Sequence, residues 1–179
     1  DNTDKIYHGQ LVIPLASGYI DHTANAAGGT VSHLGVFQGC QYVSSVTGKP
    51  TWSNYWPGSG ADSDFPVKAF INDDPSQLYV IATNASWTSK ENARASVFLN
   101  ASLSTGITGT VATGLSLGRI AISTLATTNS LTLRVMGWVD DSDNQDFASA
   151  GIGAIVRINN PFNAPTGSIA AGTVSTTGV

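Results

Sequence analysis

Apolar and polar residues alternate along several short segments of this chain, and Gly, Pro, Asn and Asp residues separate these segments. Alternation with a period of two is typical of strands that bury one face, and such breaks are typical of turns. We predict strands at 6–15, 34–43, 65–72, 78–83, 120–125, 131–139 and 152–158. The pattern therefore predicts an all-β fold, either a small β-barrel or a β-sandwich.

Segment 34–43 is apolar on both faces and is predicted to be buried on both sides. Its pattern places Leu34, Val36, Cys40 and Tyr42 on one face and Phe37 and Val43 on the other. Gly35 and Gly39 lie inside this segment, and glycine in a strand indicates a bulge or a close approach of another backbone.

Two hairpins are predicted. Asp73-Asp74-Pro75-Ser76 has turn composition and would join strands 65–72 and 78–83. The second hairpin pairs 120–125 with 131–139. In strand 131–139, alternation places Leu131, Leu133, Val135 and Val139 inward and Thr132, Arg134, Met136 and Trp138 outward.

One short helix is predicted within 88–99. Thr88 and Glu91 have the spacing of a capping box, in which Thr88 would cap the first turn. Ala93, Val97 and Phe98 would then share the apolar face of a helix of two to three turns.

The composition excludes several classes of protein. Only 11% of the residues are charged and the net charge is −4, without a basic run, so we expect no nucleic-acid partner. No apolar run is long enough to span a membrane as a helix, so no membrane partner is expected. Cys40 is the single cysteine, which excludes an internal disulfide. So little charge suits a surface that contacts other protein, although an ordinary extracellular or virion β-domain has the same composition.

The last 19 residues carry no charged side chain and are rich in Ala, Gly, Ser and Thr. Disordered segments usually carry more charge than this. We therefore divide the chain into a β-rich body, 1–160, and an extended C-terminal arm, 161–179, that packs on a neighbouring molecule.

The sequence contains no recognisable catalytic or cofactor-binding motif. His8, His22 and His33 lack metal-ligand spacing, and no nucleophile elbow or phosphate-binding glycine loop is present. The chain has a single Glu, Glu91, so the pair of carboxylates that a glycosidase needs would have to come from its aspartates. We expect a protein that is not an enzyme and has no cofactor and no metal. The acidic run 140–146 is interpreted as a solvated turn, with a calcium site as the alternative.

Trp52, Tyr55 and Trp56 form a dense aromatic cluster. Such residues anchor interfaces, fill cores or stack on sugar rings. Together with Phe65 and Phe162, they are the residues that we expect at an interface.

Several segments resemble a pattern in tailed-bacteriophage head decoration (cement) proteins. These are Gly-Val-Phe-Gln-Gly-Cys-Gln-Tyr at 35–42, Gly-Lys-Pro at 48–50, Ser-Asn-Tyr-Trp-Pro-Gly at 53–58, 69–75 with the apolar strand 78–81, and 155–160. The resemblance covers about half of the chain, chiefly 34–83 and 119–160. It implies a β-rich virion structural protein, often a homotrimer, that binds the major capsid protein on the outer surface of the capsid and stabilises the shell. The alternative is a carbohydrate-binding β-domain that acts as an adhesin or host-attachment module.

Overall fold

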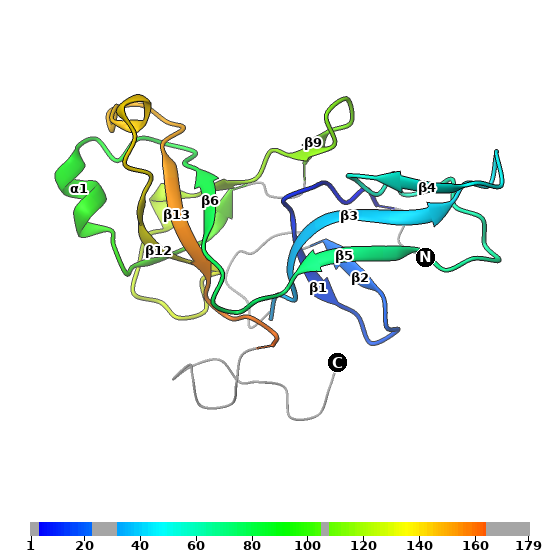
Figure 1. Ribbon diagram of the computed structural model, residues 1–179. Helices are drawn as coiled ribbons and strands as arrows, with labels where there is room; N and C mark the ends of the chain where they lie inside the picture. The colour runs from blue at the N-terminus through cyan, green and yellow to red at the C-terminus, as the bar shows by residue number, and fades with distance from the viewer. Residues whose placement is uncertain (1–3, 23–31, 105–107, 164–179) are drawn as a thin grey trace.

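The computed structural model describes residues 4–22, 32–104 and 108–163, and its fold is all-β and sandwich-like. The first sheet contains β1 (Leu11–Pro14), β2 (Ile20–His22), β3 (Gly35–Val43), β4 (Pro50–Ser53) and β5 (Lys68–Asn72). The second contains β6 (Tyr79–Ala82), β7 (Asn100–Ala101), β12 (Leu133–Trp138) and β13 (Gly153–Ile158). The two sheets lie at opposite ends of the molecule (Figure 1). The all-β prediction is confirmed, and neither sheet closes into a barrel within the described ranges.

Shorter elements complete the described chain. Strand β8 (Leu103–Ser104) pairs with β11 (Arg119–Ile120), and β9 (Gly109–Thr110) pairs with β10 (Leu115–Ser116). One α-helix, α1 (Lys90–Ala95), and two 3₁₀ turns, at Ile122–Thr124 and Ser142–Asn144, account for the helical residues in these ranges. The single short helix that the sequence predicts is therefore present.

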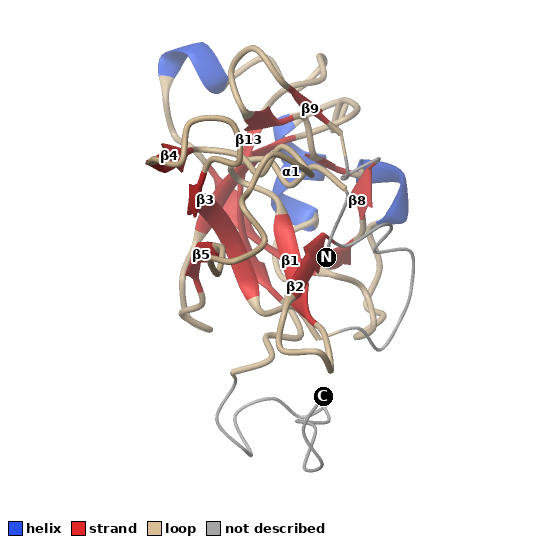
Figure 2. Ribbon diagram, turned by 90° about the vertical axis from the view of Figure 1, so that its right-hand side faces the viewer, coloured by secondary structure: helices blue, strands red, loops and turns tan. Residues whose placement is uncertain are grey.

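Strand β3 is the centre of the first sheet. Gln41 of β3 pairs with Trp52 of β4 and with Lys68 of β5, so β4 and β5 lie on opposite edges of β3. Val36 likewise pairs with Leu11 of β1 and with β5. Strand β5 is therefore alone on its edge, and β1, β2 and β4 occupy the other side of β3. Figure 2 shows β5 and β2 on opposite sides of this sheet.

The bulge predicted from the glycines of β3 is present at Gly39. The register between β3 and β5 shifts between Phe37 and Gly39, and Gly39 has a φ of +142°. The predicted assignment of faces is wrong because it ignores this extra residue. The bulge brings Cys40 onto the same face as Phe37, whereas Val36 points to the other side. Both faces in this part of β3 are buried, as predicted.

The core has two parts that share β3. Leu11 and Val36 join the apolar residues of the second sheet in the larger cluster, so these side chains hold the two sheets together. Ile6, Val12, Phe37 and Cys40 form the smaller cluster on the other face of the first sheet. Because successive side chains of a strand point to opposite faces, neighbours such as Leu11 and Val12 enter different clusters.

Neither predicted hairpin forms. Strand β5 pairs with β3 in the first sheet and β6 pairs with β13 in the second, so the turn at 73–76 carries the chain from one sheet to the other. Part of the predicted strand 120–125 is the 3₁₀ turn Ile122–Thr124, and β12 pairs with β13 and β7 instead. Thr132 is buried rather than outward, and a bulge after Val135 breaks the alternation of β12.

The helix is shorter than predicted and starts one residue later. Ser89, not Thr88, caps it, and the Ser89 side chain accepts a hydrogen bond from the Asn92 amide. Thr88 has a φ of +65° and precedes the cap. Phe98 lies beyond the helix and is 69% exposed, so it does not share an apolar helical face with Ala93.

The beginning of the predicted arm packs on its own body. The amide of Phe162 donates to the carbonyl of His33 (2.7 Å), and the amide of His33 donates to the carbonyl of Asn160 (3.0 Å). Residues 164–179 lie outside the described part of the chain. Burial lowers the pKa of His33 from 6.5 to about 4, because its surroundings disfavour the charged imidazolium.

We predict that the protein loses stability as the pH falls from about 6.5 to about 4. In this window the unfolded state binds a proton at His33 that the folded state excludes, so unfolding is favoured as pH falls. The full loss is about 3 kcal/mol in the free energy of unfolding. Urea unfolding of a His33→Gln variant should show a flatter pH dependence than the wild type in this window. Equal slopes in wild type and His33→Gln would contradict the prediction.

We also predict that Gly39→Ala destabilises the fold by about 2 kcal/mol or more. A Cβ atom at Gly39 would lie 2.8 Å from the carbonyl oxygen of Ser53, in a backbone conformation that L side chains rarely adopt. Gly137→Ala is the matched control, because a Cβ atom there meets nothing within 4 Å. Thermal unfolding of both variants provides the measurement, and equal melting temperatures would contradict the role of the bulge.

Candidate functional site

The aromatic cluster predicted from the sequence is divided between the surface and the interior. Trp52, on β4, is 58% exposed, and its ring lies 5.0 Å from that of Phe70 on β5, with the ring planes at 58°. Phe70 is 44% exposed. These two strands flank β3, so the aromatic pair crosses over the bulge at Gly39, whose position approaches the Trp52 ring.

Trp56 and Tyr55 point toward the body of the protein. Trp56 is partly buried, packs edge-on against Tyr42 at 5.7 Å, and exchanges two backbone hydrogen bonds with Ile6. Tyr55 stacks on Tyr7 with a centroid distance of 5.8 Å and an angle of 11°. The chain leaves the sheet after Ser53, and the Trp56 ring packs in the smaller core cluster, on the face of the first sheet that lies away from the second.

The other two expected interface residues lie apart from each other. Phe65 is 53% exposed in the loop before β5. Phe162 is partly buried beside His33, close to the opposite end of β5, where Asn163 bonds to Asp73. The structure thus places Trp52, Phe65 and Phe70 on exposed positions of the first sheet and its loops. Phe162 is partly buried, and its amide donates to the carbonyl of His33.

An apolar groove, which the sequence did not reveal, lies on the outer face of the first sheet. It has a volume of about 290 Å³ and lies between β5 and the β1–β2 turn. Its lining is almost entirely apolar: Ile6, Gly18, Tyr19, Ile20, Phe37, Cys40, Trp56, Val67, Ala69 and Ile71. We call this the β5 groove. The alternation of Val67, Ala69 and Ile71 was its sequence signal, but the pairing of β5 was needed to interpret it.

A hollow beside the 58–66 loop adjoins the β5 groove. This hollow, of about 680 Å³, shares Tyr19, Trp56 and Val67 with the groove and adds the carboxylates of Asp62 and Asp64. Burial raises the pKa of the Cys40 thiol in the groove to about 11. The thiol is therefore protonated at neutral pH and poorly suited to act as a nucleophile.

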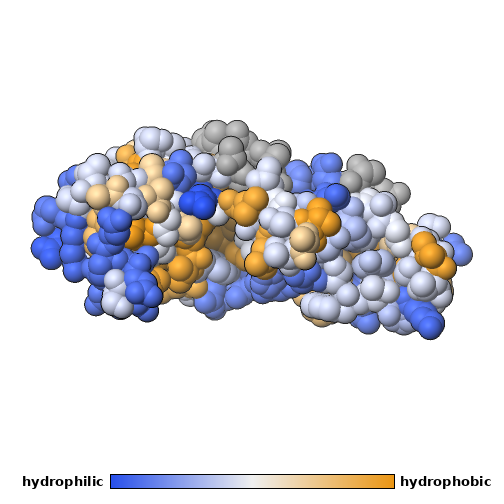
Figure 3. Space-filling view, turned by 90° about the horizontal axis from the view of Figure 1, so that it is seen from above, coloured by the Kyte–Doolittle hydropathy of each residue, from blue (hydrophilic) through white to orange (hydrophobic). Residues whose placement is uncertain are grey.

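A second cavity, of about 470 Å³, lies between the two sheets. Leu11, Val36, Ile81 and Val156 are among its apolar lining residues, and His8 lies at its edge with Nδ1 3.0 Å from the Gln38 carbonyl oxygen. Figure 3, seen from above, shows hydrophobic residues gathered around a hollow between the two ends of the molecule. The lining of the cavity between the sheets belongs mainly to the larger core cluster and contains no carboxylate.

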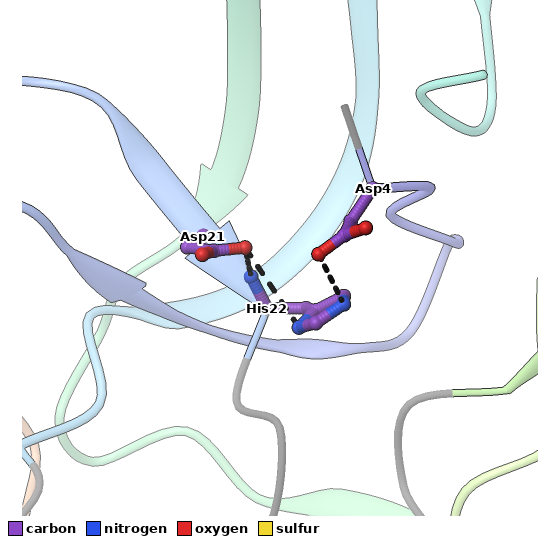
Figure 4. A group of neighbouring side chains, drawn as sticks. All are labelled: Asp4, Asp21 and His22. Atoms are coloured by element: carbon purple, nitrogen blue, oxygen red, sulfur yellow. Dashed lines mark hydrogen bonds and ion pairs between the residues drawn. The ribbon is translucent and has the colours of Figure 1, made fainter. Parts of the chain in front are cut away.

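His22 lies between two carboxylates at the edge of the first sheet (Figure 4). Its Nε2 is 3.7 Å from Oδ2 of Asp4, and its Nδ1 is 3.7 Å from Oδ1 of Asp21, which also accepts a hydrogen bond from the His22 amide. The candidate ligand atoms of these three residues lie within 4.8 Å of one another, close enough to surround a metal ion. The same geometry makes an ion pair that ties Asp4 to β2 when the imidazole is protonated, and Asp4 itself is exposed.

The acidic run 140–146 forms a turn whose carboxylates bond within it. Asp141 accepts from the Asp143 amide (3.0 Å), Asp140 from the Gln145 side chain and Asp146 from Ser149. Among the described residues, the groups able to surround a metal do not include these aspartates. These bonds are those of a turn at the surface, and the calcium alternative stays a hypothesis.

Comparisons with protein-family models, with curated proteins and with solved structures find no match for this chain. Within the described ranges, no helix has the length and apolar character needed to cross a membrane. A proposal for the function therefore rests on the geometry of the site and on the resemblance noted from the sequence.

We predict that the two tryptophans differ sharply in their effect on stability. Trp56→Ala should cost about 2 kcal/mol or more, because its ring packs in the smaller core cluster. Trp52→Ala should cost less than about 1 kcal/mol, because its ring is largely exposed. Chemical denaturation of the two variants tests this difference, and a larger loss for Trp52→Ala would contradict the assignment.

Proposed function

We propose that this protein is a capsid decoration protein that binds the outer surface of an assembled phage head and stabilises it without catalysis. The observation that carries the proposal is the exposed, weakly charged aromatic surface of the first sheet, formed by Trp52 and Phe70 with Phe65 nearby in sequence to β5. It lies on the segments that resemble decoration proteins. Its proposed partner is the major capsid protein.

The chemistry of this surface supports binding to protein. Large aromatic rings that are exposed in the free protein gain stabilisation when a partner covers them. Lys68 shares this face with the two rings, and a partner that leaves its charge in water avoids the cost of burying it. The apolar residues exposed on this sheet also include Tyr19 and Val67 at the β5 groove.

Stabilisation of a shell would follow from mass action. A protein that binds the assembled shell and not its separated subunits shifts the equilibrium toward the shell. A homotrimer over a local three-fold axis would bridge several capsid subunits, and its contacts would reinforce one another. We propose this trimeric state. Light scattering of the purified protein and of protein recovered from particles measures it, and a monomer in both samples would contradict it.

The carbohydrate-binding alternative requires an aromatic platform on which sugar rings can stack. Trp52 is exposed, but Trp56 is engaged with Tyr42 and Ile6, so these two rings do not form one exposed platform. The geometry therefore supports protein binding better than sugar binding. A glycan-binding assay on Trp52→Ala distinguishes the two, since only the sugar-binding alternative predicts a glycan affinity that this variant loses.

We predict that phage heads stripped of this protein break at a lower temperature than intact heads, and that adding the protein back restores them. A Trp52→Ala/Phe70→Ala variant should bind stripped heads at least about tenfold more weakly, because interface aromatics commonly contribute more than 1 kcal/mol each. Co-sedimentation measures binding, and thermal or osmotic breakage measures stabilisation.

Phe98→Ala is the matched control for this experiment. Phe98 is an aromatic residue that is more exposed than Trp52 and Phe70, but it follows α1 and its amide donates to the carbonyl of Val135 in β12 of the second sheet. Its loss should leave head binding unchanged. Stripped heads that resist heat and osmotic shock as well as intact heads would refute the decoration role.

A further inference from the structure

His22, Asp4 and Asp21 form a cluster at the edge of the first sheet that the proposed function does not use. Asp21 and His22 are the last two residues of β2, which is an edge strand of this sheet. Asp4 belongs to the N-terminal segment. Two residues later, Ile6 is buried in the smaller core cluster and exchanges two backbone hydrogen bonds with Trp56. The fold itself therefore holds Asp4 beside the end of β2.

The distances within the cluster suit an ion between its members better than direct contact. Figure 4 shows the His22 ring between the two carboxylates. Nε2 lies 3.7 Å from an oxygen of Asp4, and Nδ1 lies 3.7 Å from an oxygen of Asp21. Neither distance is short enough for a hydrogen bond. Two ligand atoms on one tetrahedral Zn²⁺, each at about 2.1 Å, lie about 3.4 Å apart.

All three residues can contribute to one such ion. One ligand atom from each of them can be chosen so that all lie within 4.8 Å of one another. The Asp4 side chain is 63% exposed, so a rotation of its carboxylate can bring an oxygen closer to the other two ligands. Asp21 accepts a hydrogen bond from the His22 amide (2.7 Å), which holds its carboxylate beside the ring. A carboxylate has about four lone-pair sites, so this bond leaves room for a metal ion.

A buried nitrogen without a partner is a second, independent sign of a ligand. The His22 side chain is only 12% exposed, and its Nδ1 is buried with no hydrogen-bond partner in the described part of the chain. Buried polar atoms nearly always have a partner, and one that lacks it calls for an explanation such as an ion. A metal ion bound at this nitrogen would satisfy it.

The ligand types select the metal. Zn²⁺ is bound in proteins by histidine nitrogen and carboxylate oxygen, often with three protein ligands and a water molecule. Ca²⁺ and Mg²⁺ bind through oxygen, so a ligand set built around an imidazole does not suit them. The two carboxylates of this cluster also balance the charge of a divalent cation.

We propose that His22, Asp4 and Asp21 bind one Zn²⁺ ion, which fastens the N-terminal segment to β2. This inference does not depend on the proposed function. It departs from the sequence-based expectation of no metal, because ligands that come from separate segments leave no motif spacing in the sequence. An ion that binds the folded chain and not the unfolded chain raises its stability.

Calorimetric titration of the full-length protein with Zn²⁺, after treatment with a chelator, tests the proposal. We expect one Zn²⁺ per chain and a higher melting temperature with Zn²⁺ than with chelator. Asp4→Asn and His22→Gln should each weaken Zn²⁺ binding at least about tenfold, since even the loss of a group that only orients a ligand commonly costs this much. Asp4 is exposed, so Asp4→Asn tests the site even where His22→Gln disturbs the fold.

NMR of the imidazole nitrogens locates the ion directly. Addition of Zn²⁺ should shift the nitrogen signals of His22 and leave those of His8 and His33 in place, whereas Ca²⁺ should leave all of them in place. His8→Gln and Asp143→Asn are the matched control variants. Among the described residues, the group able to hold a metal ion includes neither of them, and both variants should keep the Zn²⁺ affinity of the wild type.

Three results would overturn the proposal. A wild-type protein that binds no Zn²⁺ in the micromolar range has no such site. Binding that survives both Asp4→Asn and His22→Gln, with unshifted His22 nitrogens, would place the ion elsewhere. An equal loss of affinity in the control variants would show dispersed binding to surface groups. None of these measurements involves phage heads, so failure of this inference and failure of the proposed function are distinguishable.

Discussion

The fold depends on strand β3, which buries both of its faces and pairs along both of its edges. On one side of the sheet, Val36 packs with the second sheet; on the other, Phe37 and Cys40 pack in the smaller cluster. The bulge at Gly39 allows this arrangement, because the extra residue turns Cys40 onto the side of Phe37. A side chain at Gly39 would collide with β4. The bulge therefore sets the face on which Cys40 lies and the register of β5 along β3.

The two faces of the first sheet have different roles. Near the second sheet, the face toward it is covered by apolar side chains of both sheets, and farther along β3 the same face carries the exposed pair Trp52 and Phe70. The opposite face is covered by Trp56 and Ile6 in one part and is hollowed into the β5 groove in another. Both faces of this sheet therefore leave apolar area exposed, and such area gains stabilisation when a partner covers it.

Low charge is the property that connects the fold to the proposed role. Polar groups of the loops are satisfied largely by short-range hydrogen bonds, such as those of Asp141 and Ser89, rather than by ion pairs. A surface of this kind has little long-range electrostatic attraction for a partner and relies on contact area. Many copies on a symmetric shell would convert modest contacts into firm attachment through avidity.

The sequence by itself determined the class of fold, most of the strands and the glycine bulge, because these depend on local alternation and on backbone preferences. It did not determine which strands pair. The turn at 73–76 has hairpin composition, yet β5 and β6 join different sheets, because an Asp-Pro turn fixes a local reversal and not the partner of the strand that follows. The Trp residues could not be sorted by sequence either: Trp52 and Trp56 are four residues apart, and only the departure of the chain from the sheet after Ser53 exposes one and buries the other. Pairing and burial are set by contacts between distant segments, and so the tertiary structure alone decided the open edge of β5, its groove and the aromatic surface.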